Sequence, residues 1–210
     1  LKNVDTGSQA LTALSVTGAT TSGTLKVSDG GTIGSASDAD AMTISSGGVV
    51  TFSQNPIGAF ISEADMFRLT ANTGAVDPVS SNLERVDDAS FSKIGTGMSV
   101  NSGIFSFPRT GLYLVRVNAL GQAINSDNIE VDVYATQDNS SYDIIAVCVG
   151  SGDDDVGTTS MSAESFVNVT DTSNVKVKFG FSSIDSGSAI QGVTAYNVTS
   201  FQFIRLGESQ

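Results

Sequence analysis

The side chains of this chain with the clearest chemical potential are carboxylates, and three of them stand in a row at Asp153, Asp154 and Asp155. Carboxylate oxygens are the hard ligands that Ca²⁺ prefers, so this run is a candidate calcium site. Adjacent like charges are costly unless a cation binds or water screens them. The alternative is a solvated acidic run that only keeps the protein soluble.

The residues that enzymes use most often are absent or isolated. There is no His in the chain, which removes the commonest general base and metal ligand. Cys148 lies in an apolar run with no histidine to activate it, so we predict a buried small hydrophobe. A glycan-cleaving carboxylate pair stays open on composition alone, but no pair stands out among 22 acids. We therefore predict a binding protein, not an enzyme, which requires no cofactor and for which Ca²⁺ is the one ion left open.

The formal net charge of −12 excludes some classes of partner. A strongly negative surface repels the phosphates of nucleic acids and the headgroups of anionic membranes. No apolar run approaches the roughly 20 residues that span a bilayer, so neither nucleic-acid binding nor membrane insertion is expected. The chain begins at Leu1 without a signal peptide, and we interpret it as a processed chain or a fragment whose missing part lies upstream.

The composition changes near residue 56. Phe52 is the one aromatic residue before that point, whereas the other ten Phe and all four Tyr follow it. The sequence Asn55–Gly58 supplies the turn residues typical of a boundary. We predict a stalk over residues 1–56 and a globular head over residues 57–210.

The stalk contains an internal repeat. Residues 25–33 align with residues 42–50: each copy has alternating apolar residues, a Gly-Gly pair and a short β-branched run. Alternation followed by Gly-Gly predicts a strand and a hairpin turn, with residues 30–41 as a loop between the copies. Such units are too small to bury their own apolar face and must stack on a neighbour or on other chains. We interpret the repeat as a fibre shaft of three chains; a flexible Gly/Ser linker is the alternative.

The head shows strand periodicity throughout. In residues 112–117, Tyr113, Val115 and Val117 alternate with Leu112, Leu114 and Arg116. Val175, Val177 and Phe179 alternate with two lysines, and Phe201 and Phe203 with polar or exposed positions. Period-2 patterns separated by turn signals predict an all-β sandwich or jelly roll.

Four segments of the head carry a family resemblance: residues 91–103, 104–115, 162–179 and 197–206. Residues 104–115 combine an aromatic strand, Pro108, a turn ending at Gly111 and then Tyr113 among alternating apolar residues. Together with the other three segments, this order resembles the complement-type globular head and the tumour necrosis factor ligands. The resemblance implies a ten-stranded jelly-roll β-sandwich head that forms a homotrimer around a threefold axis and is preceded by a stalk.

The jelly-roll topology implied by this resemblance brings three loops together at the end of the head far from the stalk. They are residues 121–128, 150–159 and 182–194. Receptor contacts are expected there from Asn125, Asp127, Asn128, Asp153, Asp154, Asp155 and Asp185, with Tyr142 as a stacking face for a sugar. The run Asp153–Asp155 is the candidate Ca²⁺ site within this group.

The stalk has no Gly-x-y period, unlike the collagen-like stalks of animal relatives. Its Gly-Gly hairpins, Thr/Ser content and acidity resemble bacteriophage fibres. We therefore expect a viral structural protein on the extracellular virion surface: a tail-fibre or head-fibre tip. Its partners would be its own copies, a host surface glycan or protein, and other virion proteins on its N-terminal side. A capsid decoration or fibre-assembly protein whose head acts as a trimerisation domain is the alternative; the repeat argues against a secreted complement-like ligand.

Overall fold

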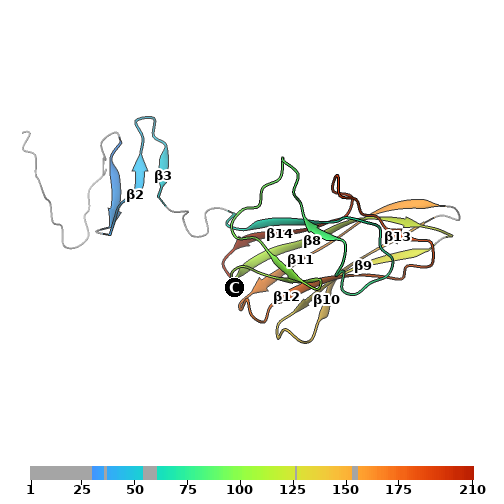
Figure 1. Cartoon of the computed structure of the whole chain (residues 1–210). Helices are drawn as coiled ribbons and strands as arrows, with labels where there is room; N and C mark the ends of the chain where they lie inside the picture. The colour runs from blue at the N-terminus through green and yellow to red at the C-terminus, as the bar shows by residue number, and fades with distance from the viewer. Residues whose placement is uncertain (1–29, 36, 54–60, 126, 153–155) are drawn as a thin grey trace, which may run out of the picture. The chain divides into compact units, whose positions relative to one another are not determined.

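The computed structural model describes residues 30–35, 37–53, 61–125, 127–152 and 156–210. The chain divides into two compact units, residues 1–55 and 56–210, which are described separately here as the stalk and the head (Figure 1). Every regular element within the described residues is a β-strand. The all-β prediction is confirmed.

The described part of the stalk is a three-stranded antiparallel sheet. Its strands, in order, are β1 (Thr32–Ser35), β2 (Asp38–Ile44) and β3 (Val50–Phe52). The predicted Gly-Gly turn joins β2 to β3: Gly48 has a φ of 79°, and its N–H donates to the Ser45 carbonyl at 3.0 Å. Glycine adopts a positive φ without the Cβ clash of other residues. The second copy of the repeat therefore forms the predicted hairpin, whereas the strand predicted at 25–27 lies outside the described residues.

The loop predicted at residues 30–41 is wrong, because β1 and the beginning of β2 occupy most of it. The register pairs Thr32 with Thr43 and Ile33 with Met42. Strand β1 therefore forms by pairing with the apolar strand of the second repeat copy. Gly, Ser, Ala and Asp have low intrinsic strand preference, and pairing to a neighbour overrides it. The Asp38 carboxylate accepts a hydrogen bond from Ser53 Oγ at 3.1 Å.

The stalk sheet has no interior of its own. None of its described residues is buried, and its larger apolar side chains are exposed, including Phe52 at 45% and Val49 at 64%. Three short strands rarely stabilise a sheet unless an apolar face is packed against something. Within residues 30–35 and 37–53, the stalk therefore shows none of the packing that would hold this sheet together.

The head is a sandwich of two antiparallel sheets (Figure 1). The five-stranded sheet has the order β10 (Asp143–Ser151), β9 (Asn128–Thr136), β12 (Lys176–Ser182), β7 (Ile104–Ser106) and β6 (Ser99–Asn101). The six-stranded sheet has the order β11 (Gly157–Val169), β8 (Gly111–Ala123), β14 (Ser200–Gly207), β4 (Ala64–Leu69) and β5 (Leu83–Arg85), with β13 (Ala189–Ile190) paired to β8. The predicted jelly-roll class is confirmed.

Strand alternation explains which side chains enter the core. In β8, Tyr113, Val115 and Val117 are buried, and the residues between them are partly exposed. The same period places Phe201 and Phe203 of β14 inside. Because side chains of a strand point to alternate faces, each of these strands lies with one face on the opposite sheet.

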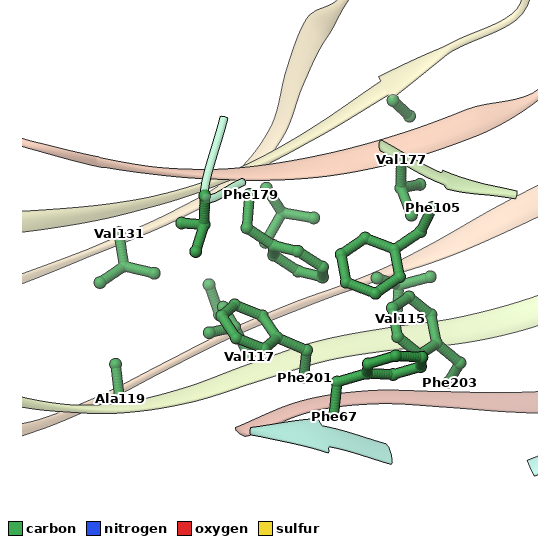
Figure 2. Packing of buried hydrophobic residues seen from close by; sticks show 14 of the residues in the cluster. Phe67, Phe105, Val115, Val117, Ala119, Val131, Val177, Phe179, Phe201 and Phe203 are labelled. Atoms are coloured by element: carbon green, nitrogen blue, oxygen red, sulfur yellow. The ribbon is translucent and has the colours of Figure 1, made fainter. Parts of the chain in front are cut away.

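Phe105 stands at the centre of an aromatic cluster contributed by both sheets (Figure 2). Its ring centroid lies 5.2 Å from Phe67, 5.0 Å from Phe203 and 5.6 Å from Phe179. Phe105 and Phe179 belong to the five-stranded sheet, and Phe67 and Phe203 to the six-stranded sheet. These contacts join the two layers.

Strand β5 ends at Arg85, and the segment after it covers a buried arginine. Arg68 of β4 is 2% exposed and forms ion pairs with Glu84 at 2.6 Å, Asp87 at 2.6 Å and Asp88 at 2.7 Å. A guanidinium can donate to several carboxylates at once through its planar fork. These pairs draw residues 87 and 88 over the face of the sheet instead of along its edge.

Candidate binding site at the loop end of the head

Three loops meet at the end of the head opposite the start of β4, as the jelly-roll prediction required. Ile124 N donates to Ser188 Oγ at 3.0 Å, which joins the β8–β9 loop to the loop after β12. Gly152 N donates to the Asp127 carbonyl at 3.1 Å, which brings in the loop after β10. The loops converge because β8, β10 and β12 all run toward this end.

Asp127 links these loops together. It is 7% exposed, and its Oδ2 accepts the Asp185 N–H at 2.9 Å. A hydrogen bond from the Ser188 side chain lowers the pKa of Asp127, and burial acts against this shift. The Asp127 carboxylate therefore holds the loop after β12 in position. The sequence did not predict this structural role.

An open, polar pocket of about 500 Å³ lies between the loops. We call it the loop-end pocket; its lining is Ala75, Asn125, Asp127, Asn128, Ser183, Ile184 and Asp185. Asn125, Asn128, Ser183 and Asp185 are exposed. Asn125 and Ser183 have φ values of 56° and 54°, a left-handed conformation that asparagine tolerates better than most residues. Four of the predicted receptor-contact residues therefore share one pocket.

The other predicted contacts do not join the loop-end pocket. Asp153, Asp154 and Asp155 lie outside the described residues, so their calcium site stays a prediction. Tyr142 lies in the β9–β10 hairpin at the opposite end of the head. Its placement among the loop-end contacts is wrong, since strand β9 separates that hairpin from the pocket.

Tyr142 packs on its own sheet instead. The Lys178 ammonium lies 4.5 Å from the centroid of the Tyr134 ring and 5.2 Å from that of the Tyr142 ring. A cation over an aromatic face is attracted by the ring quadrupole. Burial, followed by the charge of Asp138, raises the pKa of Tyr142. This tyrosine is a packing residue around Lys178.

Glu130 and Asp132 both contact Ser182, the residue before pocket-lining Ser183: Glu130 pairs with it across the sheet, and Asp132 accepts its hydroxyl hydrogen bond. Both acids were missed in the sequence. Their side chains leave β9 on the face away from the core. The alternate residues Ile129, Val131 and Val133 point into the core and are buried. The alternation of residues 129–134 could have placed both carboxylates on one face. Ala75 and Ile184 come from segments without periodicity, so no pattern marked them.

Several chemistries find little support in the described residues. No group of three or more Asp, Glu or Cys side chains there is arranged to hold a metal ion. Cys148 is half-buried, not fully buried as predicted, and burial, followed by the charge of Asp132, raises the pKa of its thiol to about 11. A neutral thiol is a weak nucleophile. No helix in the described part of the chain has the length and apolar character needed to cross a membrane.

A second surface lies on the outer face of the six-stranded sheet. Ala64, Ile204, Leu114 and Phe166 are cross-strand neighbours from β4, β14, β8 and β11 and form an apolar row. Phe166 is 65% exposed. In the adjacent row, Arg116 Nε donates to Glu164 Oε2 at 2.7 Å. Ala64, Leu114 and Ile204 are partly buried, so Phe166 is the most accessible apolar side chain of this row.

No protein-family model matches the sequence, and no curated protein matches it. Among solved structures, murine APRIL at pH 5.0 aligns with a TM-score of 0.53 at 14% identity, covering 69% of this chain and 98% of that one. Eiger TNF from S. frugiperda aligns with a TM-score of 0.56 at 12% identity, covering 72% of this chain and 96% of that one. The head is a tumour-necrosis-factor-like jelly roll. The shared portion is the jelly-roll head, and at this identity the likeness concerns the fold.

Proposed function

We propose that the chain is a homotrimeric bacteriophage fibre protein, of a tail or head fibre, whose jelly-roll head binds a receptor on the host cell surface. The observation that carries the binding role is the loop-end pocket, where polar side chains from separate loops converge. Binding residues are frequently carried by loops that a rigid scaffold positions. The two sheets supply that scaffold.

The lining of the loop-end pocket suits a glycan. Asn125 and Asn128 offer amide donors and acceptors, and Ser183 adds a hydroxyl. Sugar hydroxyls are satisfied by such groups, and a wet polar pocket binds through direct and water-mediated hydrogen bonds. The absence of His from the chain favours binding over catalysis.

The apolar row supports the trimer. Burying Phe166, Leu114 and Ile204 against copies of the same chain would remove apolar surface from water, which contributes about 25 cal/mol per Å². A threefold arrangement would also bring three stalks together and give each short stalk sheet a packing partner. The N-terminal side of the stalk would then contact other virion proteins, with the head on the extracellular surface.

Competition for host adsorption tests the proposal. The purified full-length protein is expected to block phage adsorption in a dose-dependent way. The double variant Asn125→Ala/Asn128→Ala should lose at least tenfold in blocking potency, while Asn139→Ala, in the exposed β9–β10 hairpin, should match the wild type. Equal potency of all three proteins would contradict a receptor site in the loop-end pocket.

A structural role is the second candidate, favoured by the exposed apolar side chains of the stalk and of the six-stranded sheet. In that case the head serves as a trimerisation domain of a capsid decoration or fibre-assembly protein. The full-length protein would then form trimers and fail to block adsorption at any concentration. Cryo-electron microscopy of the virion would place it on the capsid lattice.

A further inference from the structure

Two acids beside the loop-end pocket have unusual surroundings. Glu130 and Asp132 are two residues apart on the outward side of β9. Although Asp132 faces away from the core, it is only 2% exposed. Gly180 lies opposite it on β12, and a Cβ there would stand 3.1 Å from a ring atom of Tyr134 and 3.5 Å from Asp77 Cβ. Because Gly180 has no side chain, Tyr134 and Asp77 can pack over Asp132.

The Asp132 carboxylate is only half satisfied. Its Oδ2 accepts hydrogen bonds from Ser182 Oγ at 3.0 Å and from the Tyr134 hydroxyl at 3.5 Å. Its Oδ1 is buried and receives no hydrogen bond from the described residues. A buried acceptor without a donor destabilises the fold, and more so when it is charged.

The surrounding charges do not supply the missing donor. The titratable groups beside the pair are Tyr134 on β9, Lys178 on β12 and Asp77 in the segment that packs beside β12. Cys148 of β10 lies opposite Val131 and packs against the core instead. Lys178 is the one cation among the groups beside the pair, and its Nζ pairs with Asp77 at 2.7 Å. Two neighbouring carboxylates with no free cation cannot both ionise at low cost.

We propose that Glu130 and Asp132 share one proton in the folded head, and that release of this proton loosens the Ser182–Ser183 corner of the loop-end pocket. The proton comes from solvent and sits on one carboxyl, which then donates to the other carboxylate. Burial, followed by the negative charge of Asp132, raises the pKa of Glu130 and agrees with this arrangement. Such a pair titrates as a unit.

The pair is coupled to the pocket through two serines. Ser182 donates to Asp132 and lies opposite Glu130 across the sheet, and the next residue, Ser183, lines the pocket. Loss of the proton leaves two neighbouring negative charges, and their repulsion weakens the contacts that keep Ser182 and Ser183 in place. The shared proton rests on the placement of both acids on one face of β9 and on the unpartnered Asp132 Oδ1, whereas its effect on receptor binding rests on the proposed function.

The direct test is a carbon NMR titration of the side-chain carboxyls in the full-length protein. One carboxyl of the pair is expected to titrate above the ordinary range of glutamate. If both groups titrate at ordinary values, the proposal is overturned. The titration needs no receptor, so a failed adsorption experiment leaves it standing, and a failed titration leaves the pocket proposal standing.

The variant Glu130→Gln gives a second test, because its amide donates permanently to Asp132. A raised pKa stabilises the fold below the ordinary glutamate value, and that stability is lost as the pH rises through the folded value. At mildly alkaline pH, E130Q should therefore melt roughly 2–4 °C higher than the wild type, with a flatter pH dependence. The control Asp143→Asn, on exposed β10, should follow the wild type.

Two outcomes of the second test count against the shared proton. E130Q melting below the wild type at alkaline pH would show that the ionised pair is not repulsive. A melting temperature that Ca²⁺ or Mg²⁺ raises in the wild type and not in E130Q would assign the pair to a metal instead.

Discussion

The stalk and the head are both antiparallel β-structures, yet their apolar side chains differ in burial. In the head, two sheets face each other across a core of Phe and Val side chains, and Phe105 is fully buried. In the stalk, one sheet stands by itself, and no described residue is buried. Strand patterning is thus present in both, whereas among the described residues buried side chains occur in the head alone.

The difference shows where the stability of this chain comes from. Hydrogen bonds between strands contribute little net free energy, because the unfolded chain bonds to water instead. Burial of apolar area and close packing supply most of the driving force. The head should therefore fold by its own core, and the stalk should depend on the copies that the head brings together.

Removing the central ring of the head is expected to have the largest effect. Phe105→Ala deletes a ring that packs with four other phenylalanine rings, and such a change costs about 3–5 kcal/mol. Denaturant unfolding followed by circular dichroism measures the loss. The matched change Phe52→Ala, at a 45% exposed position of the stalk, should leave the unfolding of the head unchanged. If both variants lost similar unfolding free energy, the proposed difference in packing between the head and the stalk would be contradicted.

Replacing the buried arginine should have the next largest effect. Arg68→Met removes a cation that pairs with Glu84, Asp87 and Asp88. Hydrogen bonds to charged groups contribute about 1.5–3 kcal/mol, and the released carboxylates can reach water, so we expect a loss of about 1–3 kcal/mol. Chemical denaturation of R68M and of Arg116→Met, whose ion pair is exposed, compares the two. An equal or larger loss in R116M would contradict this assignment.

Changing the apolar row should affect assembly more than folding. Phe166→Asp adds a charge at a 65% exposed position, so the head should lose less than about 1 kcal/mol. The variant is expected to be monomeric, and the amides of Met42–Ile44 in the stalk should then exchange hydrogen rapidly. Hydrogen-exchange mass spectrometry checks this coupling. Protected stalk amides in a monomeric variant would show that the stalk is stable without partners.

The smallest expected effect concerns pH at the β9–β10 hairpin. The backbone N–H groups of Ser141 and Ser140 donate to the Asp138 carboxylate, and they lower its pKa well below the ordinary aspartate value. A lowered pKa contributes stability above the unfolded value, which is lost as the pH falls. Asp138→Asn should therefore reduce the acid sensitivity of melting slightly. An unchanged acid profile would contradict this role.

Much of the head could be predicted, because period-2 alternation has a simple geometric cause. Residues 112–117 alternate in sequence, and β8 buries every second side chain accordingly. Residues 30–41 carry no such pattern, and β1 forms there only because β2 lies beside it. Likewise, no sequence pattern near Arg68 predicts its ion pairs with Glu84, Asp87 and Asp88.

The candidate site was predictable in part. The topology brought Asn125, Asn128 and Asp185 together, as three loops at one end require. The role of Asp127 depended on hydrogen bonds to Asp185 and Ser188, which loop composition does not reveal. Tyr142 was misplaced because its residue type suited a sugar, while its position in the β9–β10 hairpin assigned it to the other end.

The mass of the 210-residue chain in solution tests the proposed trimer most directly, since partner copies would cover both the exposed apolar side chains of the stalk and the apolar row of the head. Sedimentation equilibrium or light scattering should give three times the 21.5 kDa of one chain. A stable monomer with a folded head and protected stalk strands would contradict the account.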